Sequence, residues 1–173
     1  KIKDIVDSTS VEVINKDLRW ESAHAKLSNY YFYKGDYDKC IAEMEAVIAE
    51  RPYYDIPYKD LITKMVDGKK LDQALTFLIK LHKIKPDYFS YKWLGQVYLK
   101  MNNSAEALKF LVEAVKFKEA EYQTWYNLSG AYYLEGDTNS ALSAIQKSLS
   151  LNSRNQAAVN FYNQLSTLIK NKK

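Results

Sequence analysis

The chain has 173 residues, of which 47% are hydrophobic and 27% are charged, a balance typical of a folded globular protein. It contains only five glycines and three prolines. Because β-sandwiches and barrels need many turns, and turns need these residues, their scarcity favours long helices joined by short loops. The net charge of +4 is small, and its 25 basic residues alternate with acidic ones, so no nucleic-acid partner is expected.

The cysteine content and the chain start bear on the cellular setting. Cys40 is the single cysteine, so no intramolecular disulfide can form. No apolar run approaches the roughly 20 residues needed to span a bilayer, and no membrane insertion is expected. The sequence begins at Lys1 rather than at methionine, which is typical of a processed product or of a fragment without its targeting signal. We therefore assign no localisation from the sequence.

Residues 1–20 are predicted to form an N-terminal extension that is only partly helical. Ile2, Ile5 and Val6 have the spacing of one short amphipathic helix, which a run of serine and threonine then ends. Asp17 is placed to cap the long helix that follows. The extension would serve either as a lid on a stack of helices or as a linker from an upstream segment.

From residue 21 onward, the sequence repeats itself. The small residues that follow each expected turn lie 34, 33 and 34 positions apart, and a leucine stands thirteen positions before each of them. Bulky residues stand three positions before and four positions after each leucine, which is the stripe of one helix face. In chain order the four columns are His24, Tyr58, Tyr91 and Trp125; Leu27, Leu61, Leu94 and Leu128; Tyr31, Met65, Tyr98 and Tyr132; and Cys40, Ala74, Ala107 and Ala141.

Each unit is predicted to consist of two antiparallel helices separated by a short turn. Glycine in three of the turns suits the left-handed conformation that ends a helix, and Asp or Asn can cap the next helix. Asn103 followed by Glu106 resembles a capping box. In the second unit Gly68 comes one place early, and Pro57 requires that unit's first helix to begin near Asp55. The four turns are 34–36, 67–69, 101–103 and 135–137.

Two units carry the fullest form of this pattern. One has Trp125, Leu128, Tyr132 and Ala141, and the other has Tyr91, Leu94, Gly95, Tyr98, Ala107 and Leu111. These residues resemble the tetratricopeptide repeat signature, and Pro52 and Pro86 stand where that family ends its second helix. The resemblance implies an all-α, right-handed superhelical solenoid of antiparallel helix pairs. It implies four repeats, 21–54, 55–87, 88–121 and 122–155, followed by a C-terminal capping helix over 156–170.

The resemblance also implies a function, because such repeats bind segments of other proteins in a concave groove lined by their first helices. Spacing alone shows only that the candidate residues share a side: Asn29, Tyr33, Lys59, Thr63, Lys92, Gln96, Lys100, Tyr126, Tyr133 and Asn160. In this set Lys59, Lys92 and Lys100 would form a basic middle between tyrosines. We expect a peptide or protein partner with an acidic segment, and the alternative that the lysines are ordinary solvated surface stays open.

No group of residues has the pattern of a catalytic or metal site, so the chain is not predicted to be an enzyme and no cofactor is expected. His24 falls in the aromatic column, His82 stands near a helix end, and Cys40 takes the small-residue column. These positions indicate packing or surface roles. The leading hypothesis is a non-catalytic protein-interaction scaffold. The alternative is a self-assembly module, or a C-terminal recruiting module of a larger bacterial protein, whether catalytic or not.

Overall fold

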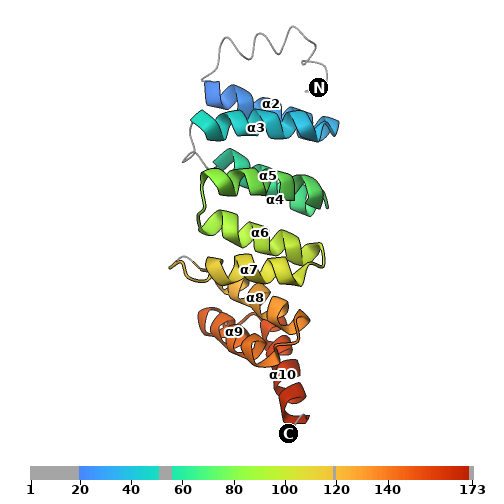
Figure 1. The fold of residues 1–173 in the computed structure, drawn as a ribbon, viewed down its shortest axis with the longest axis vertical. Helices are drawn as coiled ribbons and strands as arrows, with labels where there is room; N and C mark the ends of the chain where they lie inside the picture. Colours follow the sequence, from blue (N-terminus) through green and yellow to red (C-terminus); the bar gives the residue numbers. More distant parts are fainter. Residues whose placement is uncertain (1–19, 51–55, 119, 172–173) are drawn as a thin grey trace. The chain divides into compact units, whose positions relative to one another are not determined.

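The computed structural model describes residues 20–50, 56–118 and 120–171, and every regular element within these ranges is an α-helix (Figure 1). The all-α fold class expected from the sequence is therefore confirmed. The chain divides into two compact units, Lys1–Ile84 and Lys85–Lys173. The expected N-terminal extension lies outside the described residues, apart from Trp20, which begins the first described helix.

The described residues of the N-terminal unit form two helix pairs. α2 (Trp20–Lys34) packs on α3 (Tyr37–Glu50), α4 (Ile56–Asp67) packs on α5 (Leu71–Ile84), and α3 also contacts α5. Pro57 is the second residue of α4, where the amide that proline lacks would have no partner within the helix. This explains why α4 begins at Ile56, next to the start predicted from the sequence. The largest buried side chains of this unit are Tyr58, Phe77, Met44, Ile48, Leu61, Ile62, Met65, Leu78 and Leu81.

In the C-terminal unit, the residues that the structure describes form five helices. They are α6 (Tyr88–Lys100), α7 (Ser104–Ala114), α8 (Tyr122–Leu134), α9 (Thr138–Leu151) and α10 (Gln156–Asn171). Each helix packs on the next in sequence, and α6 also contacts α8. Two hydrophobic clusters hold the unit together, one centred on Leu111 and Leu128 and the other on Ile145 and Leu165. Consecutive helices thus bury their apolar faces against each other, as in a repeat protein.

Four helix-connecting turns share one backbone geometry. A left-handed residue stands in each, and the amide after it bonds to the carbonyl five positions earlier, as in a Schellman motif. The left-handed residues are Gly35, Lys69, Asn102 and Gly136. The sequence suggested Gly68 for the second turn, and this was wrong, because Lys69 is the left-handed residue there. The turn thus keeps the register of the repeat although its glycine does not.

The repeated columns are the contacts that set helix spacing. All four leucines and all four small residues of the columns are buried. Gly95 shows why one position must be small, because a Cβ atom there would lie 2.5 Å from Cγ of Leu111 and 3.4 Å from the carbonyl oxygen of Ala107. At the equivalent place in other units, Ser28 Oγ lies 3.3 Å from Cys40 Sγ, and Ser129 Oγ donates to the Ala141 carbonyl at 2.7 Å. These contacts link the two helices of a pair.

Side-chain caps fix several helix starts in the C-terminal unit. Asn103 accepts a hydrogen bond from the Glu106 amide at 3.2 Å, at the place where the sequence predicted a cap. Asp87 and Ser90 form a full capping box at the start of α6, which the sequence analysis missed. Because a cap satisfies amides that have no partner within the helix, these residues determine where each helix begins.

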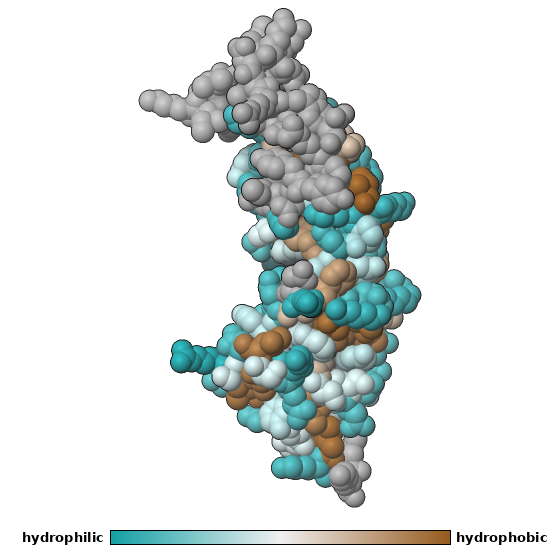
Figure 2. Space-filling view, turned by 90° about the vertical axis from the view of Figure 1, so that its left-hand side faces the viewer, coloured by the Kyte–Doolittle hydropathy of each residue, from teal (hydrophilic) through white to brown (hydrophobic). Residues whose placement is uncertain are grey.

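The face of the molecule drawn in Figure 2 is mostly polar. On the face drawn in Figure 2, hydrophilic residues cover most of the described surface and hydrophobic residues form separate patches among them. Large hydrophobic side chains that are exposed include Tyr33, Ile79, Ile84, Leu134 and Leu151. None of the helices in the described ranges has the length and hydropathy of a membrane span.

Candidate functional site

In the N-terminal unit, the predicted site residues lie on the first helix of each pair. Asn29 and Tyr33 belong to α2, and Lys59 and Thr63 belong to α4. The Thr63 hydroxyl donates to the Lys59 carbonyl at 3.0 Å, so it satisfies its own helix. Tyr33 is 75% exposed, which is unusual for so large a ring and leaves much of its surface accessible to a partner.

A third residue, Lys64, brings Asn29 and Tyr33 together. Its Nζ donates to Asn29 Oδ1 at 2.9 Å and lies 5.9 Å from the centre of the Tyr33 ring. Asn29 Nδ2 in turn donates to the Ala25 carbonyl at 3.1 Å, which orients the amide. We name Asn29, Tyr33 and Lys64 the Lys64 corner. It joins a positive charge, an oriented amide and an exposed aromatic ring.

The sequence analysis missed Lys64 because it chose the α4 residues by their four-residue spacing from Lys59. That spacing selects Thr63 and skips the next position. The interhelical contact, which spacing along one helix does not reveal, identifies Lys64 instead. Lys59 is half-buried and Thr63 is exposed on the same helix.

In the C-terminal unit, Lys92 has a structural partner. Its Nζ lies 2.8 Å from Glu121 Oε2 and 5.7 Å from the centre of the Tyr88 ring, and its side chain is only 17% exposed. Tyr88 also accepts a hydrogen bond from the Glu121 amide at 3.0 Å. Lys92 therefore ties α6 to the residue before α8. The three lysines expected to form a basic middle are not in equivalent settings, since the Lys92 side chain is largely buried and ion-paired whereas Lys100 is exposed.

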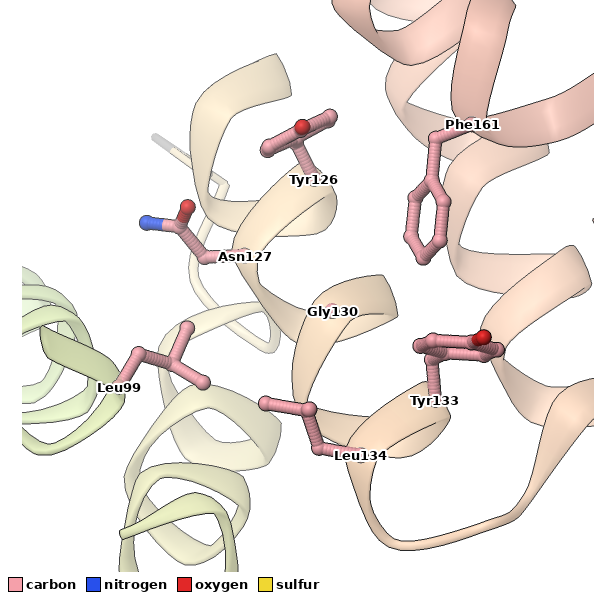
Figure 3. A pocket seen from close by; sticks show the side chains of 7 residues that line it. All are labelled: Leu99, Tyr126, Asn127, Gly130, Tyr133, Leu134 and Phe161. Atoms are coloured by element: carbon pink, nitrogen blue, oxygen red, sulfur yellow. The ribbon is translucent and has the colours of Figure 1, made fainter. Parts of the chain in front are cut away.

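A pocket of about 270 Å³ opens in the C-terminal unit among α6, α8 and α10 (Figure 3). Two predicted residues, Tyr126 and Tyr133, line it. Phe161 points from α10 toward Tyr133, and their ring centres lie 5.5 Å apart at an interplanar angle of 86°. Tyr126 meets the same Phe161 ring at 6.2 Å, also edge to face. The full lining is Leu99, Tyr126, Asn127, Gly130, Tyr133, Leu134 and Phe161.

Gly130 is the smallest residue of the pocket lining. A Cβ atom at Gly130 would meet nothing within 4 Å, so the space beside it is open. Leu134, at the end of α8, is 61% exposed and forms part of the pocket edge. Among the described residues, those that line the pocket carry no charge.

Phe161, Leu99, Leu134 and Asn127 line the pocket but were missing from the predicted site. The sequence analysis selected Asn160 on the last helix, yet its Oδ1 accepts from Gln156 Nε2 at 2.9 Å and the next residue lines the pocket. Because α10 follows the last repeat, the columns gave no register for it. Gln96 is half-buried on α6 and does not belong to the lining.

The chemically reactive residues have structural partners. Cys40 is buried, and burial raises the pKa of its thiol, which disfavours the reactive thiolate. His24 Nδ1 pairs with Glu43 Oε2, which links α2 to α3. In the part of the chain that the structure describes, no group of three His, Cys, Asp or Glu residues could hold a metal ion.

The sequence model of the tetratricopeptide repeat matches residues 21–54, 90–121 and 122–155, which together make up more than half of the chain. The chain belongs to the tetratricopeptide repeat family. The first matched segment contains α3 and all of α2 except Trp20, and the last contains α8 and α9. In this tetratricopeptide repeat protein, the predicted second repeat, 55–87, and the predicted capping role of the last helix stay predictions.

Solved tetratricopeptide repeat structures have a similar fold. Residues 41 to the end of MamA from Desulfovibrio magneticus RS-1 give a TM-score of 0.69 at 16% identity, over 88% of this chain and 87% of that one. YrrB, described as a tetratricopeptide repeat protein with an unusual peptide-binding site, gives 0.69 at 14%, over 95% and 86%. The second such domain of human RPAP3, in complex with the HSP70 peptide SGPTIEEVD, gives 0.58 at 18%, over 62% and 91%. A search of curated protein sequences found no match.

Proposed function

We propose that this tetratricopeptide repeat protein is a non-catalytic scaffold that binds a segment of another protein on the faces of its first helices. The observation that carries the proposal is the pocket on α6, α8 and α10, because two of the residues selected from the sequence line it. Aromatic side chains give a large contact area at a low entropy cost, which makes such a pocket suited to a protein partner.

The similar solved structures support this proposal. The YrrB structure is described by its peptide-binding site, and the RPAP3 domain was solved with a bound peptide. At the low identities involved, these proteins share the fold with this chain, and their partners remain their own. These structures support the proposal because, in a stack of helix pairs, one face of each first helix is not covered by its neighbours and can contact a partner.

The Lys64 corner has the chemistry expected of a site for the partner's acidic segment. There the Lys64 ammonium lies beside an oriented amide and an exposed ring, three groups that can contact a carboxylate and the chain around it. Lys92 lies in the other unit, and its side chain is only 17% exposed. Lys59 and Lys100 are the other two lysines that the sequence predicted for the site.

Selection from a phage-displayed random peptide library tests the proposal. The complete folded chain is immobilised, and a second immobilised protein serves to remove peptides that bind the support. We expect peptides that bind with micromolar dissociation constants and that protect first-helix amides from hydrogen exchange. A library that yields no peptide specific for this chain, or peptides that protect only the second helices, would contradict the proposal.

A matched pair of variants tests the acidic-segment hypothesis. Lys64→Gln removes the charge of the Lys64 corner, and Lys109→Gln removes an exposed charge that is paired with Glu106 on α7, a second helix. For a peptide with an acidic group, Lys64→Gln should weaken binding severalfold and reduce its dependence on salt. Equal effects of the two variants would contradict the assignment of the acidic group to Lys64. Light scattering over a concentration series, run alongside, reports self-association.

A further inference from the structure

Two of the three helices that form the pocket in the C-terminal unit, α8 and α10, are almost free of charged residues, whereas α6 carries Lys92 and Lys100. α8 contains no Asp, Glu, Lys or Arg, and the single charged residue of α10 is Lys170, in its last turn. The charges nearest in sequence to the lining are Lys100, which follows Leu99, and Glu135, whose carboxylate accepts from the Ser104 hydroxyl. A charged group that entered the pocket would lose part of its hydration and would meet no opposite charge among the lining residues.

The size of the pocket restricts what it can hold. Its volume of about 270 Å³ lies just below the range of about 300–1,000 Å³ that is usual for small-molecule sites. This space suits one bulky side chain better than a cofactor. Its walls are the edge-to-face rings of Tyr126, Tyr133 and Phe161, with Leu99 and Leu134 on the other side (Figure 3). Such walls favour an apolar occupant by dispersion and by burial of apolar surface.

Neutral amides stand next to this apolar space. Asn127 belongs to the lining, and its Oδ1 accepts a hydrogen bond from Gln123 Nε2 at 3.3 Å, one turn earlier on the same helix. A carboxamide carries both donors and acceptors, so it can bond to the backbone of a bound segment whatever the sequence of that segment. The site thus combines a neutral apolar cavity with groups that suit a peptide backbone.

We propose that this pocket anchors one uncharged, bulky apolar side chain of the bound segment, such as leucine, isoleucine, methionine or phenylalanine. The proposal rests on the proposed scaffold function and names the chemistry that the C-terminal unit recognises. The acidic group expected of the partner would then bind outside this pocket. The pocket fits such a side chain because its lining is uncharged, which disfavours a carboxylate, and because its volume is close to that of a single large side chain with some room to spare.

Gly130 provides the test, because the space beside it is open and its backbone is helical. Gly130→Met would place an unbranched side chain in the pocket, and Gly130→Ala would add one methyl group and leave most of the space. Both variants replace glycine in a helix with a better helix former, so both should keep the fold. Circular dichroism and thermal melting check this before binding is measured.

The probes are the peptides selected from the random library on the wild-type chain, each paired with a version whose apolar residue is replaced by alanine. We expect the selected sequences to share one bulky apolar residue, and Gly130→Met to weaken their binding about tenfold or more, with a small change for Gly130→Ala. The alanine-substituted peptide should bind wild type and Gly130→Met about equally, because its anchor is already lost.

Two results would overturn the inference while the scaffold function stands. One is a set of selected peptides without a shared apolar residue, and the other is unchanged affinity in Gly130→Met. Failure to select any specific peptide would contradict the scaffold function and this inference together. The two kinds of failure are therefore distinguishable.

Discussion

Lys69 and Gly136 occupy the same position of two helix-connecting turns and share a left-handed backbone, with φ values of 58° and 84°. In each turn the next amide bonds to the carbonyl five residues earlier, at 2.7 Å to Met65 and at 2.9 Å to Tyr132. The geometry is therefore set by the repeat rather than by the residue. Only glycine adopts it without a steric cost.

We predict that Lys69→Gly raises the free energy of unfolding by about 1 kcal/mol, because it removes the steric strain of a left-handed side chain. Gly136→Ala should lower it by a similar amount, about 1 kcal/mol, for the opposite reason. Urea denaturation followed by circular dichroism measures both. Asn102→Gly is the control and should have a smaller effect, since asparagine tolerates this conformation. A loss of stability in Lys69→Gly would refute this account of the turn.

Two glycines inside helices should respond in opposite ways to the same substitution. Gly95→Ala would place a methyl group 2.5 Å from Leu111 Cγ, so we expect it to destabilise the chain by about 1–3 kcal/mol. Gly130→Ala meets open space and should stabilise it by about 1 kcal/mol through helix propensity. Thermal melting compares them directly. Shifts of the same sign in both variants would show that packing at Gly95 is not the cause.

Because of Cys40, the free energy of unfolding should depend on pH in the alkaline range. Burial raises the pKa of its thiol above the ordinary value of 9.0, the Asp36 carboxylate adds to this shift, and the contact with Ser28 opposes it. Below the ordinary pKa the thiol is protonated in both states, so the folded chain keeps its full stability. As the pH rises further, the unfolded chain ionises first and the folded state loses stability.

Cys40→Ala tests this, because alanine occupies the same column in the other units. Between about pH 8 and pH 10, the wild type should lose more unfolding free energy than Cys40→Ala. Iodoacetamide should modify the native thiol slowly and the urea-unfolded thiol rapidly, as expected for a buried cysteine. Rapid modification of the native chain would contradict the buried environment of Cys40.

Because of Asp137, the stability of the folded chain should depend on pH in the acidic range. It caps α9, and hydrogen bonds from the Ser140 side chain and then from its amide hold the pKa of Asp137 below the ordinary 3.8. The stabilisation is fully present above pH 3.8 and is lost as the pH falls through the folded-state pKa. Asp137→Asn keeps a capping oxygen without the titrating charge. The wild type should melt above this variant at about pH 6 and level with it at about pH 2. An equal gap at both pH values would exclude this titration.

The family and the helix pairs could be predicted from the sequence because their cause is local. Leucines at fixed spacing make one apolar helix face, and small residues such as Ala107 and Ala141 allow two helices to cross closely. Four such columns in one register are therefore enough to predict the helix pairs. The turn positions followed from the same register. Gly68 misled the prediction of the second turn because residue type was given more weight than the period, whereas the backbone kept the period.

The candidate site was predictable only in part. Tyr126 and Tyr133 lie in the last repeat, where the columns fix which way each residue faces, and both line the pocket. Phe161 lies on α10, beyond the last column, so no register oriented it. Lys64 and Lys92 illustrate a second limit, because ion pairs and amide contacts between helices depend on which residues the packing brings within about 3 Å.

The sequence by itself therefore determined the repeat, its helices and the side of each helix that is buried, since these follow from periodic burial along a single chain. Only the tertiary structure decided where charge and open space remain. It paired Lys92 with Glu121 and placed Lys64 next to Asn29 and Tyr33. It also left open space beside Gly130, in a pocket that Phe161 of another helix helps to line. The reason is that a pocket is made by side chains from several helices, and their meeting depends on packing between elements rather than on spacing within one.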